Sequence, residues 1–322
     1  MLKSIIRRVA AGAALAAVAA GAQAQGFPKG PINLVIPLTP GDATDIAARA
    51  MGDELAKLLK VPVVALNRPG AGGAVGTDSV VKAAKDGHTI LITVNAALTL
   101  RRILDPQNVT YDPLKDLVPL GLTTRIPSIV ALRDDVPVRN FAEMIDYAKK
   151  NPGALRAGTV GAGSVGDFTV RIINSLAGVE ITMVPFKGAS PAITALRGGH
   201  VEAVAVALGA ISGHIRSGAV RGIVTSNKFP DFPAIPTMVE LGFKQNLPAI
   251  WLGFFAPAGV PPEATGTLVP AIEKVARDPA IAARLAGLGM LQDYAPPEKL
   301  VEEIREEHRT LEQIAKQAGL AK

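Results

Sequence analysis

The sequence predicts an α/β protein of two lobes, each built around a mostly parallel sheet that is flanked by helices. Short apolar strand patterns alternate with helical patterns, which is typical of βαβ units and parallel sheets. Gly (32) and Pro (25) are plentiful and aromatic residues make up only 4%, which suits short loops between many elements. The chain has 322 residues. A single core stops growing at about 250–300 residues, so two lobes are expected.

The first 24 residues have the pattern of a secretory signal peptide. Lys3, Arg7 and Arg8 give a positively charged start, and Val9–Ala20 is a short, Ala-rich apolar run. Ala22–Ala24 has the small-x-small form of a cleavage site, so we expect cleavage after Ala24 and a periplasmic location. The alternative, a membrane anchor, is disfavoured because the run is shorter than the roughly 20 residues that a span needs.

Strand and helix patterns alternate in the first part of the mature chain. Apolar residues recur at helical spacing from Ile46 to Leu59, with charged residues off that face. We expect strands at Ile32–Leu38, Val63–Leu66 and Thr89–Val94, and a second helix near Ala74–Ala84. This series predicts βαβ units.

A second cycle of the same alternation begins near Thr123. Expected strands are Ser128–Leu132, Leu155–Val160, Ile181–Pro185, Val201–Leu208 and Val220–Thr225, with helices near Asn140–Lys150, Gly166–Leu176, Ser190–Leu196 and Ala210–Ser217.

The chain then returns to the first lobe. After a Pro-rich stretch that follows Ser226, we expect a strand at Ile250–Ala256 and helices near Pro262–Arg277, Pro279–Leu288 and Pro297–Gly319. We therefore assign residues 25–124 plus 226–322 to the first lobe and 125–225 to the second. Two crossings, near Thr124 and Thr225, would act as a hinge.

Composition and spacing exclude several classes of function. The net charge of +6 falls to +3 without the three basic residues of the signal peptide (31 basic minus 28 acidic). No basic stripe with interleaved aromatic residues is present, so no nucleic-acid partner is expected. Histidines at 88, 200, 214 and 308 are not at metal-ligand spacing, so no metal is expected. Ser164 lacks a G-x-S-x-G frame. We expect no catalytic residue, no cofactor and no enzymatic activity.

Two Gly-rich loops point to an anion site. Pro37–Asp45 and Asn67–Gly76 each follow a strand and lead into a helix start. Such a loop directs free backbone N–H groups and the positive end of a helix dipole at whatever lies above it. Gly41 lets the backbone approach a ligand, and Asp42 or Thr44 can cap the helix. The alternative is a capped helix with no ligand.

A third loop, Gly161–Gly166, fits the dinucleotide pattern G-x-G-x-x-G between a strand and a helix. The acidic residue expected at the end of the next strand is missing, and Glu180 lies before that strand. The loop is therefore interpreted first as an anion cradle. The alternatives are a tight turn and a secreted NAD-dependent oxidoreductase.

Six segments together carry a resemblance to a known family. They are IPLTPGDATD (Ile36–Asp45), NRPGAGGAVG (Asn67–Gly76), DGHTILI (Asp86–Ile92), YDPLKDL (Tyr111–Leu117), VPFKGASPAITALRGGHVE (Val184–Glu202) and WLGFFAPAGVP (Trp251–Pro261). Over essentially the whole mature sequence, the chain resembles the substrate-binding proteins of tripartite tricarboxylate transporters, the Bug family of periplasmic receptors.

The resemblance implies a periplasmic-binding-protein-like (Venus flytrap) architecture. Such a receptor captures a small organic carboxylate between its lobes and hands it to a tripartite tricarboxylate-type membrane permease. We expect a monomer; a receptor that has lost transport and only signals is a further alternative. By motif position, the resemblance places ligand contacts at Gly41, Asp42, Ala43, Thr44, Asp45, Thr93, Asn95, Ala96, Gly163, Ser164, Val165, Asp167, Phe186, Lys187, Gly188 and Val206.

The sequence departs from the family pattern at Asp42, Asp167, Phe186 and Val206. A carboxylate that faces a carboxylate at ~4 Å costs about 4 kcal/mol at an effective dielectric constant of 20. Either Asp42 and Asp167 turn away as caps, or the ligand is less anionic than is usual, or it carries a hydroxyl or ammonium group. Phe186 and Val206 favour an apolar ligand body.

Overall fold

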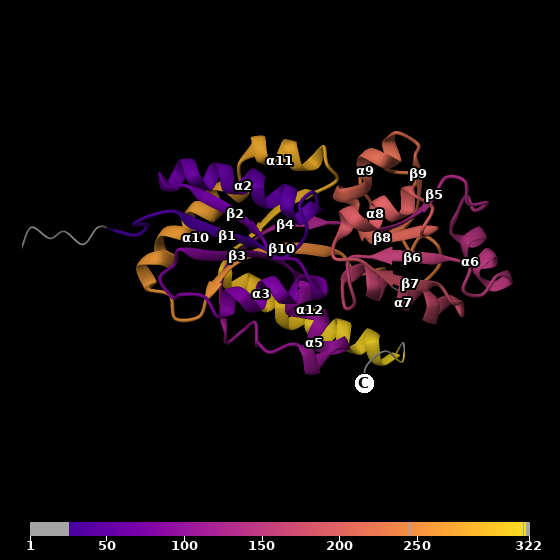
Figure 1. Ribbon diagram of the computed structural model, residues 1–322, viewed down its shortest axis with the longest axis horizontal. Coiled ribbons are helices and arrows are strands. Elements are labelled where there is room, and N and C mark those ends of the chain that lie inside the picture. The colour runs from indigo at the N-terminus through magenta and orange to yellow at the C-terminus, as the bar shows by residue number, and fades with distance from the viewer. Residues whose placement is uncertain (1–25, 245, 318, 320–322) are drawn as a thin grey trace, which may run out of the picture.

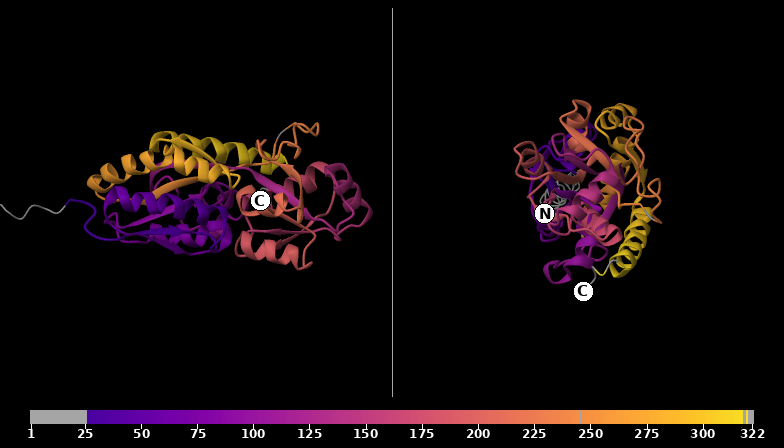
Figure 2. Two further views of the ribbon diagram at one scale, coloured as in Figure 1. Left: turned by 90° about the horizontal axis from the view of Figure 1, so that it is seen from above. Right: turned by 90° about the vertical axis from the view of Figure 1, so that its right-hand side faces the viewer.

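The structure is a computed structural model that describes residues 26–244, 246–317 and 319. The predicted signal peptide and its cleavage site after Ala24 lie outside these residues. The described chain forms two lobes side by side along the long axis of the molecule, each around one sheet (Figure 1). The views in Figure 2 show the C-terminal helices, in yellow, along one side of the molecule.

The first lobe contains a six-stranded sheet that is buried on both faces. Leu34 and Ile92 pack toward α2 (Ala43–Leu59) and α10 (Pro262–Ala276), while Val35 and Leu91 face α3 (Ala74–Val81) and α12 (Pro297–Gln317). Burial on both faces explains the continuous apolar strands. In spatial order the strands are β11 (Leu291–Ala295), β4 (Leu117–Ile126), β10 (Ile250–Pro257), β3 (Thr89–Val94), β1 (Ile32–Ile36) and β2 (Val63–Asn67).

The second lobe contains a five-stranded sheet. Its apolar side chains form one cluster with α6 (Phe141–Lys150) and α7 (Val165–Ala177), and another with α8 (Ala189–Arg197) and α9 (Leu208–Arg216). The spatial order of the strands is β7 (Thr182–Pro185), β6 (Arg156–Thr159), β8 (Ala203–Ala207), β5 (Ser128–Arg133) and β9 (Val220–Thr225).

Four α-helices and strands were not predicted from the sequence, which placed only the start of a second cycle near Thr123. These are β4, α4 (Asn95–Leu98), α5 (Leu100–Leu104) and the edge strand β11. The two short helices continue an apolar run after β3, and β11 has the half-exposed sequence LQDYA, so neither shows a clear period. The predicted helix near Pro279–Leu288 is α11 (Pro279–Ala286).

The prediction of mostly parallel sheets needs correction, because both sheets are mixed. In the first sheet β1 pairs in parallel with β2 and β3, but β10 is antiparallel to both β3 and β4. In the second sheet β6 pairs in parallel with β7 and β8, but β5 is antiparallel to β8 and β9. The physical reason is the crossing of the chain between lobes. A strand that enters a lobe at the crossing runs away from the other lobe, whereas its neighbours end there.

The two crossings lie next to each other. The chain leaves the first lobe between β4 and β5 at Pro127, and β10 brings it back with Ile250 paired to Ile126. Between β9 and β10, Phe229 and Ile235 pack in the apolar cluster of Ile129 in the second lobe. Ser128 Oγ also donates to the Pro248 carbonyl oxygen at 2.7 Å. We propose that the return crossing lies near Pro248, later in the chain than the predicted Thr225.

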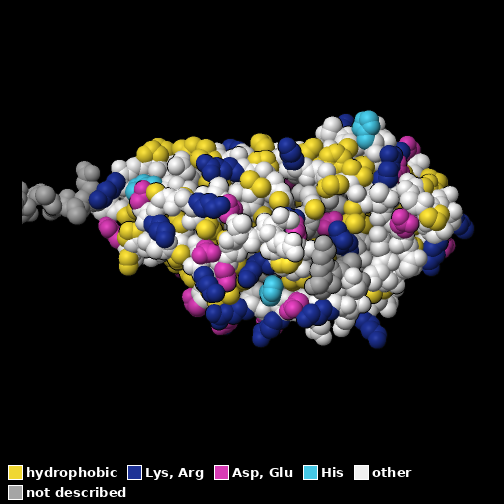
Figure 3. Space-filling model, turned by 60° about the horizontal axis from the view of Figure 1, so that its bottom comes forward, with side chains coloured by type: hydrophobic (Ala, Val, Ile, Leu, Met, Phe, Trp, Pro, Cys, Tyr) yellow, Lys and Arg dark blue, Asp and Glu magenta, His cyan; other side chains and the backbone are white. Residues whose placement is uncertain are grey.

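None of the helices in the described part of the chain is both long and apolar enough to cross a bilayer. On the face shown in Figure 3, Lys and Arg side chains are interspersed with Asp and Glu side chains.

Candidate functional site

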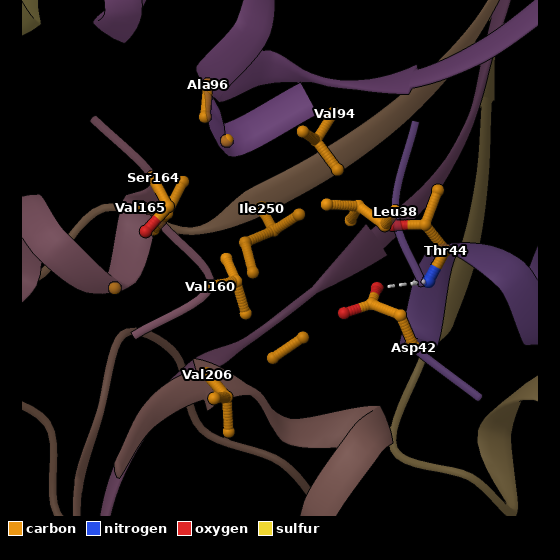
Figure 4. A pocket seen from close by; sticks show the side chains of 13 residues that line it. Leu38, Asp42, Thr44, Val94, Ala96, Val160, Ser164, Val165, Val206 and Ile250 are labelled. Carbon is orange, nitrogen blue, oxygen red and sulfur yellow. Dashed lines mark hydrogen bonds between the residues drawn. The ribbon is translucent and has the colours of Figure 1, made fainter. Parts of the chain in front are cut away.

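A narrow cavity lies where the two lobes meet. Its volume is about 30 Å³ and its lining is predominantly apolar (Figure 4). The first lobe supplies Leu38, Asp42, Thr44, Gly72, Val94, Ala96 and Ile250 to its lining, and the second supplies Val160, Ser164, Val165, Gly166, Val206 and Ala207.

The fold places helix N-termini at this cavity. The carboxyl ends of β1 and β6 lead into loops that line it, while β3 and β8 end at the cavity and pass directly into α4 and α9. Ligands in open α/β sheets bind outside the carboxyl ends of the strands. The first turns of α2 and α7 contribute Thr44, Val165 and Gly166 to the lining, so free amides from both lobes are close to the cavity.

The loop before α2 is held by a capping network that turns Asp45 away from the cavity. Gly41 adopts φ +81° and its N–H donates to Asp45 Oδ2 at 2.9 Å. Arg49 Nε and Asn67 Nδ2 donate to Asp45 Oδ1, each at 2.9 Å. Burial raises the pKa of Asp45, but the Arg49, Asn67 and Gly41 donors together bring it below its ordinary value. Asp45 therefore stays ionised as part of the scaffold.

The loop before α7 uses the same device at the same spacing. Gly163 adopts φ +73°, and its N–H donates to Asp167 Oδ2 at 2.9 Å. Arg171 Nε donates to the same oxygen at 3.1 Å. Ser164 is the N-cap residue, and its Oγ accepts from the Asp167 N–H. Asp167 is thus compensated by Arg171 and does not line the cavity.

Asp42 differs from these two carboxylates. It is the N-cap residue of α2, is only 2% exposed, and its Oδ1 accepts from the Thr44 N–H at 2.9 Å. Its other oxygen points into the cavity (Figure 4). Burial raises the pKa of Asp42, while the Thr44 and Ala189 donors oppose that rise. Among the described residues that line the cavity, Asp42 is the only ionisable one.

The lobes are closed on each other around the cavity. Ser190 Oγ in the second lobe donates to the Pro40 carbonyl oxygen at 2.9 Å. Arg101 in α5 is 6% exposed, and its Nη1 donates to the Ala162 carbonyl oxygen at 2.6 Å. The Gly188 backbone also lies close to the Thr39 side chain of the first lobe: a Cβ on Gly188 would lie 2.0 Å from Thr39 Oγ1.

Some of the predicted ligand-contact residues line the cavity, and the others lie outside its lining. Gly41 and Gly163 support the loops, Ala43 is buried at the start of α2, and Gly188 lies at the contact between lobes. The predicted residues that line the cavity are Asp42, Thr44, Ala96, Ser164, Val165 and Val206.

Four other predicted contacts point elsewhere. Thr93 Oγ1 lies 3.1 Å from Thr77 Oγ1 inside the first lobe. Asn95 donates through Nδ2 to the Ala249 carbonyl oxygen and to Glu307 in α12. The Phe186 ring packs over Gly158 in the second lobe, and Lys187 is exposed. These side chains stabilise the fold or face solvent, and they do not line the cavity.

The sequence did not identify the apolar half of the lining. Gly72 belongs to the second Gly-rich loop, and the glycine pattern of that loop did point to this segment. Gly166 closes the G-x-G-x-x-G pattern. The remaining apolar lining residues carry no local signal that separates cavity wall from core: Leu38, Val94, Val160, Ala207 and Ile250.

The glycines of the Gly161–Gly166 loop are explained by close packing. A Cβ on Gly161 would lie 3.2 Å from the Gly72 nitrogen of the other lobe, and one on Gly166 would lie 2.0 Å from the Ala205 carbonyl oxygen. Gly163 is held at positive φ beside Arg101. The loop therefore meets the other lobe across the cavity, and its glycines do not require a dinucleotide.

Comparison with known proteins identifies the family. The model of the tripartite tricarboxylate transporter family receptor matches residues 47–320. The chain belongs to this family. The structure of the periplasmic binding protein BugD is similar with a TM-score of 0.87 and 29% sequence identity, covering 92% of this chain and 99% of that one.

Two further solved members contain organic acids. A Rhodopseudomonas palustris protein, MatC with bound malate, has a TM-score of 0.83 and 30% identity, covering 89% of this chain and 99% of that one. An R. palustris protein with adipate, Rpa4515, has a TM-score of 0.87 and 28% identity over 92% and 99%. The family consists of periplasmic solute-binding receptors, so the chain is a receptor and not an enzyme. This finding rules out the alternative of a secreted NAD-dependent oxidoreductase.

Proposed function

We propose that this receptor captures a small organic carboxylate in the cavity between its lobes and delivers it to a tripartite tricarboxylate-type membrane permease. The observation that carries the proposal is the position of the cavity between the N-termini of α2 and α7. Backbone amides and the helix dipole favour an anion there without a basic side chain. The family membership and the acids bound by MatC and Rpa4515 support the ligand class.

Closure of the lobes is the proposed means of capture. Only the closed form lets both lobes contact one ligand, so the ligand shifts the population toward closure. The permease then recognises the closed form. Contacts such as Arg101 to Ala162 and Ser190 to Pro40 hold the lobes together independently of the ligand.

We propose direct ligand contacts for the predicted residues that line the cavity, while the other predicted residues position the loops. Since one chain supplies both sides of the lining, a monomer is sufficient for binding. The mature receptor would work in the periplasm after cleavage near Ala24.

A binding screen tests the proposal. Protein that has been unfolded and refolded to remove any bound compound is screened by thermal shift against mono-, di-, hydroxy- and amino acids. A ligand that binds only the folded state raises Tm, so at least one acid should do so, and calorimetry should then give a 1:1 complex. If no carboxylate of any size raises Tm, the proposal is wrong. Uptake by vesicles that contain the cognate permease should require the loaded receptor.

A further inference from the structure

The cavity has one acidic end and one end formed by backbone amides. At the acidic end, the second carboxylate oxygen of Asp42 points into the space between Leu38 and Val160 (Figure 4). At the other end, Ser164 and Val165 begin α7, whose first amides have no intrahelical acceptor. An anionic group therefore fits at α7, and a hydrogen-bond donor fits at Asp42.

No cation of the protein compensates Asp42 at this cavity. The described residues that line it include no Lys, Arg or His, whereas Asp45 and Asp167 each pair with an arginine outside it. An isolated carboxylate that is removed from water is costly unless it is paired and hydrogen-bonded. When the lobes are closed, Asp42 is compensated either by a positive charge on the ligand or by a proton of its own.

We propose that the ligand of this receptor is a monocarboxylate that also carries a protonated amine, and that Asp42 binds this amine. The inference rests on the proposed function and specifies its ligand class. The carboxylate of the ligand lies at the N-terminus of α7, and its carbon chain contacts the apolar wall between the two ends. A zwitterion of this kind brings both of its charges to matching partners.

A dicarboxylate is the competing ligand for the same space. It would place a second carboxylate against Asp42, which is tolerable only if Asp42 takes up a proton. Burial raises the pKa of Asp42 and so favours this proton, but two donors act in the opposite direction. The Thr44 N–H donates to it at 2.9 Å, and the Ala189 N–H from the second lobe faces it. Both donors stabilise a carboxylate and not a carboxylic acid.

Matched acids test the inference by calorimetry near neutral pH. The probes are pentanoate, 2-aminopentanoate, 5-aminopentanoate and pentanedioate, with the corresponding four- and six-carbon sets. An amine-bearing acid should bind the unmodified protein at least about tenfold more tightly than the plain acid of equal length, because charge-assisted hydrogen bonds contribute this much. Pentanedioate should bind more weakly than the amine-bearing acid.

The variant Asp42→Asn separates the role of charge from that of capping. Asparagine is an equally good N-cap residue, so the fold is expected to persist, which Tm checks. The preference for the amine should fall to less than about threefold, the residual that a neutral hydrogen bond leaves. The control Asp53→Asn changes an exposed carboxylate of α2 that does not line the cavity, and should keep the preference.

Three outcomes would overturn the inference. Tighter binding of a dicarboxylate than of every amine-bearing acid would remove it while leaving the proposed function in place. An amine preference that survives in Asp42→Asn would remove Asp42 as its cause. Binding of none of the probes or of the acids in the wider screen would end both the inference and the proposed function.

Discussion

At the scale of single residues, Asp42 and Asp45 show how one turn of helix gives two carboxylates opposite properties. Asp45 accepts from Gly41, Arg49 and Asn67 and is held ionised. Asp42 accepts from Thr44 with one oxygen and turns the other toward the cavity. The sequence identified Asp42 as a possible cap, but the direction of each side chain depends on partners such as Asn67, 22 residues from Asp45 along the chain.

Gly41→Val is expected to abolish ligand binding and leave the fold intact. A β-branched residue at φ +81° costs about 1–2 kcal/mol, and a Cβ there would lie 3.0 Å from Ser190 Oγ in the other lobe. Both effects oppose closure over the cavity. Calorimetry with the best acid of the screen measures affinity, and urea unfolding measures stability.

The matched control is Gly153→Val. Gly153 also has positive φ (+76°), but its Cβ would meet only Thr182 Oγ1 at 4.0 Å, away from the cavity. This variant should show the same loss of stability with unchanged affinity. Equal affinity of the Gly41 variant and the unmodified protein would show that the Pro37–Asp45 loop does not control binding.

At the scale of elements, α12 is hydrogen-bonded to α4, beside the cavity, through a buried carboxyl group. Glu307 as a residue is half-buried, but its carboxyl group points inward and accepts from Asn95 Nδ2 at 2.5 Å and Thr99 Oγ1 at 3.0 Å. Asn95 Nδ2 also donates to the Ala249 carbonyl oxygen at 3.0 Å, beside the start of β10. Burial raises the pKa of Glu307 to about 7, against the opposing effect of Asn95 and Thr99.

This raised pKa predicts a pH-dependent stability. The folded state holds the Glu307 proton up to about pH 7, whereas the unfolded chain releases it near its ordinary value of 4.5. The stabilisation is therefore complete below pH 4.5 and is lost as the pH rises through about 7. The shift corresponds to about 3 kcal/mol.

Urea unfolding at several pH values compares the protein with Glu307→Gln, which keeps a neutral side chain at all of them. Between pH 4.5 and 8, the unmodified protein should lose about 3 kcal/mol of unfolding free energy relative to this variant. Glu306→Gln, at an exposed neighbour, should show no such trend. A stability difference that stays constant with pH for Glu307→Gln would contradict the prediction.

The elements differ in how far the sequence could predict them. The strand, glycine loop and capped helix at Ile32–Leu59 follow from local alternation and cap chemistry, and the structure contains them. The reversed direction of β10 and the inward turn of Asn95 do not follow from local patterns, because they depend on partners far along the chain. Asn95 bonds to residues 154 and 212 positions away, which no local pattern reports.

At the scale of the whole molecule, the closed form depends on a close approach at Gly188. Its Cβ would lie 2.0 Å from Thr39 Oγ1 of the other lobe and 2.9 Å from Thr39 Cβ, so no side-chain rotation makes room for it. Gly188→Ala should therefore hold the lobes apart. We expect at least about a tenfold loss of affinity, since only the closed form contacts the ligand from both sides.

Small-angle scattering should show a larger radius of gyration for Gly188→Ala than for the unmodified protein when ligand is present. Gly213→Ala, in α9 of the same lobe with nothing within 4 Å of its added Cβ, serves as the control and should still close. Unchanged affinity and compactness of the Gly188 variant would show that the lobes close without this contact.

The adjacent, antiparallel course of β4 and β10 has a consequence for how such a receptor moves. Since Ile126 and Ile250 are paired neighbours, both connections between the lobes emerge side by side from one sheet. Two connections that lie on one short line allow the lobes to rotate about that line, and they resist sliding or twisting of one lobe against the other. We therefore expect opening and closing to follow mainly one axis, so that a single pair of fluorophores across the mouth of the cavity would report the transition.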